Sequence, residues 1–158
     1  MSAPRCTIVI PTFNRAVSLK ETLGSLNVQL DQDFDVIVVS DGEDVALRSA
    51  SQSIHAPFPL TWIFHANNRG QAAARNTGAA AATGDFLLFL DDDTPAAPDL
   101  LTRHVARHLS AAPQQNLAVV GKVVELRREP LTLPTVKFLQ DFRQRDLETY
   151  ARLTGAAG

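Results

Sequence analysis

The chain has 158 residues, of which 45% are hydrophobic, so it is long enough to form one compact domain with its own core. Its formal net charge is -2, and no run of basic residues supports binding to nucleic acid or to an anionic membrane. A single cysteine, Cys6, excludes an internal disulfide framework and a cysteine-rich zinc site. We expect Cys6 to be a small buried residue of the first strand.

The first residues contain no apolar signal region, and no apolar stretch is long enough to cross a bilayer. The sequence therefore predicts a cytoplasmic domain. It leaves open a peripheral attachment to a membrane through an anchor outside this chain.

The first half of the chain alternates between apolar runs and helical spacing. Residues 6–10 form a β-rich apolar run that is stopped by Pro11, and 34–40 form a second run. Between them, leucines recur at helical spacing as far as Leu30, which predicts a helix over 16–30. A short helix over 45–53 follows the second strand.

The second half continues this alternation. A strand over 60–65 leads to a helix over 71–82, in which small side chains allow a close approach to a sheet. A run of apolar residues within 84–90 predicts a strand that is buried on both faces. The remaining predicted elements are a helix over 98–111, a strand over 117–126 and a helix over 135–153.

Strands that alternate with helices predict an α/β fold with a doubly wound, mainly parallel sheet flanked by helices. Residues 1–126 are expected to form this core, and 127–158 are expected to form a helical extension.

Three consecutive carboxylates, Asp91, Asp92 and Asp93, follow the predicted strand over 84–90. In open α/β sheets, ligands bind beyond the carboxyl ends of the strands, so these side chains are expected to lie at a binding crevice. Neighbouring carboxylates repel one another unless a cation or a ligand rich in donors offsets the repulsion. A divalent cation, Mn²⁺ or Mg²⁺, prefers such oxygen ligands, whereas the simpler alternative is a solvated acidic turn.

Four blocks of residues together resemble family 2 glycosyltransferases of the GT-A fold, in the order and at the kind of spacing found in that family. The blocks are Thr7 to Arg15, Val38 to Gly42, Asn68 to Gly70 with Ala74 to Gly78, and Gly84-Asp85 with Phe89 to Asp93. The resemblance implies a Rossmann-like GT-A core that binds a nucleotide-sugar donor together with a divalent cation.

The resemblance also implies roles for individual residues. Asp41 would contact the nucleobase, and Arg75 would reach the base or the diphosphate. Asp93 would be the metal ligand, while Asp91 or Asp92 would face the ribose or share the metal. The remaining residues expected to line the donor pocket are Pro11, Thr12, Asn14, Arg15 and Gly42.

These residues also have simpler interpretations. Asp41 and Gly42 are a frequent turn pair, Asn14 is a plausible helix cap, and Arg75 can pair with an exposed acid.

The reaction implied by the resemblance is transfer of the sugar, with inversion, to a hydroxyl group of a saccharide, a lipid or another acceptor. A carboxylate would deprotonate that hydroxyl as general base. In the family this base belongs to an acceptor-binding half, and nothing after Leu126 resembles that half, so Asp141, Asp146 and Glu148 receive no such role. We interpret the chain as a fragment that supplies the donor site.

Two other functions remain open. The run from Phe86 to Thr94 also resembles the nucleophile motif of haloacid-dehalogenase-like phosphatases, which would make Asp91 the nucleophile and Asp93 the acid and base. The second is a non-catalytic module that binds a nucleotide-sugar.

Overall fold

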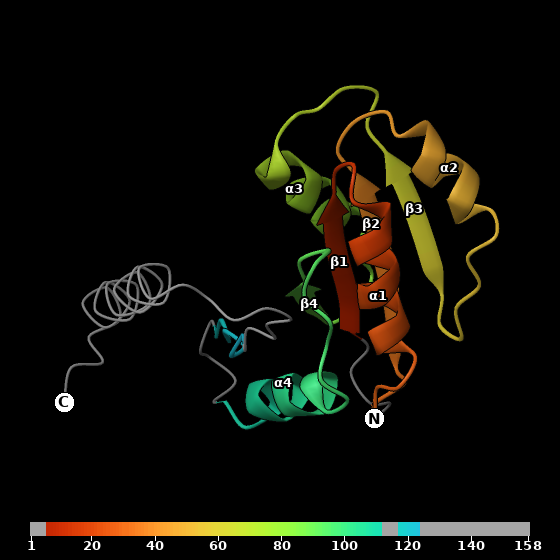
Figure 1. Cartoon of the computed structure of the whole chain (residues 1–158). Coiled ribbons are helices and arrows are strands. Elements are labelled where there is room, and N and C mark those ends of the chain that lie inside the picture. The colour runs from red at the N-terminus through yellow and green to blue at the C-terminus, as the bar shows by residue number, and fades with distance from the viewer. Residues whose placement is uncertain (1–5, 112–116, 124–158) are drawn as a thin grey trace, which may run out of the picture. The chain divides into compact units, whose positions relative to one another are not determined.

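The computed structural model describes residues 6–111 and 117–123. Its strands and helices alternate along the chain (Figure 1). They are β1 (Cys6–Thr12), α1 (Ala16–Leu26), β2 (Phe34–Ser40), α2 (Val45–Ser51), β3 (Leu60–Phe64), α3 (Gln71–Ala81), β4 (Phe86–Phe89) and α4 (Leu100–Leu109).

The strands form one parallel sheet in the order β3-β2-β1-β4. Cys6 of β1 is opposite Phe34 of β2 on one side and opposite Phe86 of β4 on the other. The predicted α/β fold with a mainly parallel sheet is therefore confirmed. Because the strands are parallel, their carboxyl ends lie along one edge of the sheet.

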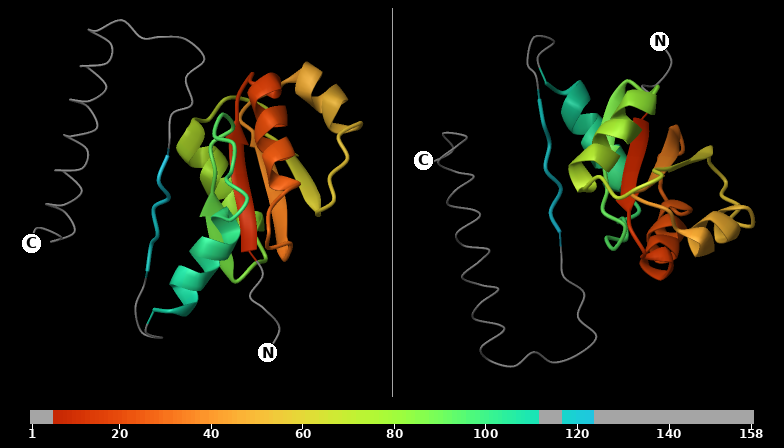
Figure 2. Two further views of the ribbon diagram at one scale, coloured as in Figure 1. Left: turned by 60° about the horizontal axis from the view of Figure 1, so that its bottom comes forward. Right: turned by 90° about the horizontal axis from the view of Figure 1, so that it is seen from above.

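Helices cover both faces of this sheet (Figure 2). On one face, Ile8 of β1 and Val36 of β2 belong to a buried cluster with leucines of α1 and α2. On the other face, Val9 and Val39 pack with Ala74 of α3. Every residue of β1 and β2 is buried, as expected of strands covered on both faces.

The first strand does not stop at Pro11, as the sequence predicts, but continues to Thr12. Proline is tolerated there because its missing N–H costs the sheet no hydrogen bond. The backbone groups of Val9 face β4, where Val9 O accepts from Leu90 N, and those of Pro11, two residues later, face the same side. The pairing of β1 with β4 ends at Val9, so no β4 acceptor is left without a partner at Pro11.

The prediction that the strand over 84–90 is buried on both faces is wrong. In the described part of the chain, β4 is an edge strand paired only with β1, and it alternates between half-buried and exposed residues. Leu87 and Phe89 are 42% and 44% exposed. A continuous apolar run identified a strand here, but it could not determine whether the strand is central or at an edge.

The predicted helix over 16–30 ends earlier, at Leu26, and Leu30 is 72% exposed. Gln29 accounts for the difference, because its buried amide donates to Ala97 O at 2.7 Å and accepts from Leu101 N at 3.3 Å. These long-range hydrogen bonds hold the turn between α1 and β2 against the start of α4.

The predicted strand over 117–126 is wrong for its described part, because 117–123 contain neither strand nor helix. The rest of that strand, the helix over 135–153 and the boundary between 126 and 127 lie outside the described residues.

Cys6 is buried in β1, as the sequence predicts. Burial, followed by the negative charges of Asp35 and Asp31, raises the pKa of its thiol to about 12. Since the thiolate is the reactive form, we expect Cys6 of the native chain to resist a thiol reagent at mildly alkaline pH and to react rapidly in guanidinium. Equal rates of labelling in the native and unfolded chain would contradict this expectation.

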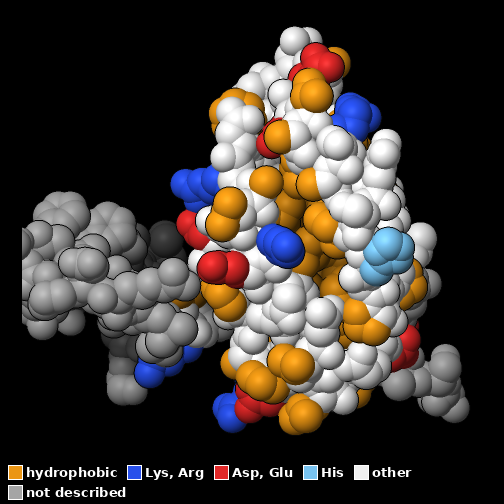
Figure 3. Space-filling view, turned by 45° about the vertical axis from the view of Figure 1, so that its right-hand side comes forward, with side chains coloured by type: hydrophobic (Ala, Val, Ile, Leu, Met, Phe, Trp, Pro, Cys, Tyr) orange, Lys and Arg blue, Asp and Glu red, His pale blue; other side chains and the backbone are white. Residues whose placement is uncertain are grey.

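The surface beside α2 and β3 carries scattered charges of both signs around exposed hydrophobic groups (Figure 3). On this side the guanidinium carbon of Arg48 lies 4.1 Å from the centroid of the Phe64 ring, which is a cation–π contact. None of the helices in the described ranges has the length and apolar character that a membrane crossing would require.

Candidate functional site

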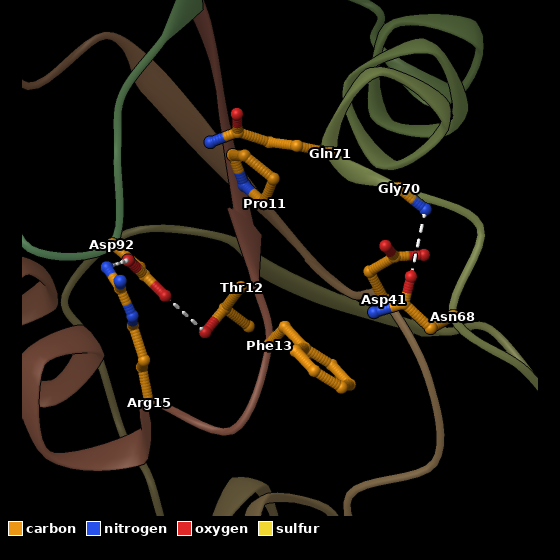
Figure 4. Close-up of a pocket in the computed structure, with 9 residues that line it drawn as sticks. All are labelled: Pro11, Thr12, Phe13, Arg15, Asp41, Asn68, Gly70, Gln71 and Asp92. Atoms are coloured by element: carbon orange, nitrogen blue, oxygen red, sulfur yellow. Dashed lines mark hydrogen bonds and ion pairs between the residues drawn. The ribbon is translucent and has the colours of Figure 1, made fainter.

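A pocket of about 280 Å³ opens at the carboxyl ends of β1 and β2. Figure 4 shows the residues that line it, which come from the ends of these strands, the loop between β1 and α1, the loop before α3 with the first residue of that helix, and the turn after β4. They are Pro11, Thr12, Phe13, Arg15, Asp41, Asn68, Gly70, Gln71 and Asp92. This is the edge of an α/β sheet at which ligands are expected.

Asp92 is the aspartate that turns inward. Its Oδ2 accepts from Thr12 Oγ1 at 2.7 Å, and its Oδ1 lies 3.4 Å from Arg15 Nη1 (Figure 4). Its backbone carbonyl also accepts from Thr22 Oγ1 of α1 at 3.0 Å. Asp92 is buried, and its hydrogen bonds attach the acidic turn to the end of β1 and to α1.

Asp91 and Asp93 turn outward, and each pairs with an arginine. Arg75 Nη2 of α3 lies 2.6 Å from Asp91 Oδ1, and Arg15 Nη1 lies 2.8 Å from Asp93 Oδ2. Each carboxylate side chain is 52% exposed. The two arginines therefore offset the repulsion within the turn, and such exposed pairs are weak enough to be exchanged for other partners.

The donor set of this turn fits a cation that is shared with a ligand. Among the residues that the structure describes, no three His, Cys, Asp or Glu side chains come together to enclose a metal ion. Mg²⁺ is usually held by one or two protein carboxylates together with substrate phosphates, and the exposed oxygens of Asp91 and Asp93 match that requirement.

Asp41 lies on the opposite side of the pocket, directly after β2. Its Oδ1 accepts from the backbone N–H of Arg69 and from His65 Nδ1, both at 2.9 Å. Burial raises the pKa of Asp41, but the hydrogen bonds from Arg69 and His65, together with the backbone N–H of Gly70, outweigh it, so the pKa lies below its ordinary value. The side chain is therefore an ionised acceptor at neutral pH.

Phe13 is an aromatic residue that the sequence did not single out for the site. It is 46% exposed, and Figure 4 shows its ring between Thr12 and the Asp41 side of the pocket. A Cβ atom on Gly42 would lie 3.1 Å from Phe13 Cε2, and Gly42 has a φ of 134°. Glycine therefore provides both the backbone conformation and the space that this arrangement needs.

The structure brings together at the pocket five of the residues expected at the donor site: Pro11, Thr12, Arg15, Asp41 and Asp92. Asn14 is exposed, has a φ of 54° and does not cap α1, whose N-cap is Arg15 without a side-chain hydrogen bond. Asn14, Gly42, Arg75, Asp91 and Asp93 are not among the lining residues.

Several lining residues were not assigned to the site from the sequence: Phe13, Asn68, Gly70 and Gln71. The first three belong to the sequence blocks that resemble the glycosyltransferases, which was the available signal.

The sequence matches the model of the family described as Glycosyl transferase family 2 over residues 7–153. It is 37% identical over 118 residues to an uncharacterized glycosyltransferase, YfnE, of Bacillus subtilis, covering 74% of this chain and 29% of that protein. It is 35% identical over 113 residues to validoxylamine A glucosyltransferase of Streptomyces hygroscopicus, covering 70% of this chain and 27% of that protein. The chain thus spans less than a third of the length of these relatives.

Solved structures with the same fold include proteins with bound nucleotide-sugars. A mannosyltransferase from Pyrobaculum calidifontis, in complex with GDP-Man and Mn²⁺, matches with a TM-score of 0.60 and 30% identity over 72% of this chain and 34% of its own. TarS 1-349 of S. aureus, in complex with UDP-GlcNAc, matches with a TM-score of 0.56 and 25% identity. The match covers 65% of this chain and 30% of that one.

Proposed function

Because the chain belongs to glycosyl transferase family 2, we propose that it binds a nucleotide-sugar and supplies the donor site of an inverting, metal-dependent glycosyltransferase. The observation that carries this proposal is the pocket at the sheet edge. It has an ionised acceptor, Asp41, on one side, the acidic turn with Asp92 on the other, and the exposed ring of Phe13 between them.

The Asp41 side is suited to the nucleobase. An exposed aromatic ring provides a surface on which a base can stack, and Phe13 is such a ring. The Asp41 carboxylate can accept a hydrogen bond from a base N–H, because a carboxylate has several lone pairs and the donors of His65 and Arg69 both bind Oδ1.

The other side of the pocket is suited to the diphosphate. Arg15 and Arg75 can donate to phosphate oxygens once they leave Asp93 and Asp91. The freed carboxylates, with Asp93 as the principal ligand, would then hold a divalent cation. When bound, Mn²⁺ or Mg²⁺ would stabilise the charge that develops on the departing nucleoside diphosphate.

The sugar would pass to an acceptor hydroxyl of a saccharide, a lipid or another compound. We assign residues 1–126 to the donor-binding core and 127–158 to an extension that leads toward an acceptor-binding half. No described residue is assigned as general base. The family match includes Asp91 to Asp93, and it supports the transferase over the phosphatase alternative for this turn.

Calorimetric titration with a panel of nucleoside diphosphates, with and without Mn²⁺, tests the proposal. We expect one base to be preferred and binding to require the cation. Phe13→Ala is expected to weaken binding by roughly 1–3 kcal/mol through the loss of stacking. Phe89→Ala is the matched control, because Phe89 of β4 is 44% exposed, close to the 46% of Phe13, and does not line the pocket.

No binding of any nucleoside diphosphate would refute the donor site, and equal binding without the cation would refute the metal. A chain that binds a nucleotide-sugar but transfers no sugar, even when joined to its adjoining sequence, would instead be a non-catalytic binding module.

A further inference from the structure

Three side chains from separate elements form a connected chain of hydrogen bonds behind the pocket. His65 directly follows β3, and its Nδ1 lies 2.9 Å from Asp41 Oδ1. Its Nε2 lies 2.9 Å from Thr77 Oγ1 of α3. The imidazole is thus held at both nitrogens, and the whole residue is only 7% exposed. His65 was not singled out from the sequence, and Thr77 was named there only within the block from Ala74 to Gly78.

The chemistry of Asp41 and Thr77 determines where the protons of these hydrogen bonds lie. An ionised carboxylate can only accept hydrogen bonds, so Nδ1 of His65 must carry the proton and donate to Asp41. When Nδ1 alone carries a proton, Nε2 is an acceptor, and the Thr77 hydroxyl can donate to it. The Thr77 hydroxyl, which can donate or accept, is thus compatible with the tautomer that Asp41 requires.

We propose that His65 is a positioning residue that fixes the orientation of the Asp41 carboxylate and thereby the pocket's selectivity for the nucleobase. This inference rests on the proposed function. The backbone N–H of Arg69 and Nδ1 of His65 both bind Oδ1 of Asp41, so together they resist rotation of the carboxylate. Neither of them binds Oδ2, and a carboxylate that also interacts with the backbone N–H of Gly70 still has lone pairs that can accept from the base.

A catalytic role for the pair of Asp41 and His65 does not fit the same contacts. A general base must come within hydrogen-bond reach of the hydroxyl that it deprotonates. Nε2 of His65 is hydrogen-bonded to Thr77 Oγ1, and the imidazole is buried. His65 therefore cannot reach an acceptor hydroxyl. The geometry supports orientation of Asp41 rather than proton transfer.

Binding measurements on the 158-residue chain test this role. His65→Leu replaces the imidazole by an apolar side chain of similar size and so removes both ring nitrogens, and we expect it to weaken binding of the preferred nucleoside diphosphate by about tenfold. Binding of the other nucleoside diphosphates should change much less, so that base selectivity falls. His65→Asn, whose amide can donate near the position of Nδ1, should recover most of the affinity.

Two controls separate positioning from a general effect on the fold. His55→Leu alters an exposed histidine that contacts Ser53 O, and it should leave binding unchanged. In an Asp41→Ala background, His65→Leu should cause no further loss, because the residue through which it acts is gone. Equal loss for all nucleotides, or an undiminished loss in the Asp41→Ala background, would overturn the proposal.

NMR of the imidazole nitrogens tests the hydrogen-bond chain without any ligand. We expect Nδ1 of His65 to be protonated, and it should stay protonated in a folded Thr77→Val variant, because the acceptor at Nδ1 is the Asp41 carboxylate. A ring protonated at Nε2 alone would overturn the proposal whatever the binding data. If the wild-type chain binds no nucleoside diphosphate, the proposed function fails first; if it binds and His65→Leu binds equally well, only the role of His65 fails.

Discussion

Asp93→Ala is expected to abolish most of the cation dependence of nucleotide binding. In the presence of Mn²⁺, affinity for the preferred nucleoside diphosphate should fall by at least about tenfold, or roughly 1.4 kcal/mol. The physical reason is that Asp93 offers an exposed carboxylate at the acidic turn, where its present partner, Arg15, can be exchanged for a cation. Without that ligand the remaining carboxylates would repel the diphosphate instead of binding it through a metal. Calorimetric titration with and without Mn²⁺ measures the effect.

Asp99→Ala is the matched control for this variant. It also removes one carboxylate, but Asp99 pairs with Arg103 at the start of α4 and does not line the pocket. Nucleotide affinity should therefore be unchanged in Asp99→Ala. If both variants lose affinity equally, net charge rather than metal binding is responsible, and the assignment of Asp93 is wrong.

Gly78→Ala is expected to destabilise the fold, although alanine normally favours a helix over glycine. A Cβ atom at this position of α3 would lie 2.3 Å from Val9 Cγ1 and 3.1 Å from Val9 Cγ2 in the central strand β1. Either the helix must move away from the sheet or Val9 must leave its packed position, which costs roughly 1–3 kcal/mol. Urea denaturation monitored by circular dichroism measures the change in the free energy of unfolding.

Two further variants identify the cause of that loss. Gly24→Ala in α1 introduces the same methyl group where nothing lies within 4 Å, so it should stabilise the chain by up to about 1 kcal/mol. Val9→Ala should reduce the cost of Gly78→Ala when the two are combined, because the clashing methyl groups are gone. Additive losses in the double variant would show that close packing of α3 on β1 is not the reason.

The local pattern of the chain predicted most of the helices and strands, and the helix over 16–30 shows how one bound was missed. The strand over 34–40 and the helix over 71–82 were found within a residue of their bounds, because apolar period and small-residue content are local properties. Leu30 fits the helical spacing but is exposed, since Gln29 forms hydrogen bonds to residues far away in the sequence. Such contacts leave no periodic signal.

For the candidate site too, some features could be predicted from local sequence and others depend on contacts between distant residues. The sequence alone located the acidic turn and Asp41 at strand ends, and the resemblance supplied their expected roles. It could not show that Asp92 turns inward to Thr12 while Asp91 and Asp93 turn outward to arginines. Three adjacent aspartates are identical in sequence, and only the surrounding partners make them different.

For this protein the sequence by itself determined the α/β alternation, the family and the position of the acidic turn, because each of these is written in short runs of neighbouring residues. Only the tertiary structure decided that β4 is an edge strand in the described part of the chain and that His65 meets both Asp41 and Thr77. These features depend on which strands and helices come to lie side by side. A hydrogen bond between residues from separate elements exists only after packing has brought them within 3 Å of each other.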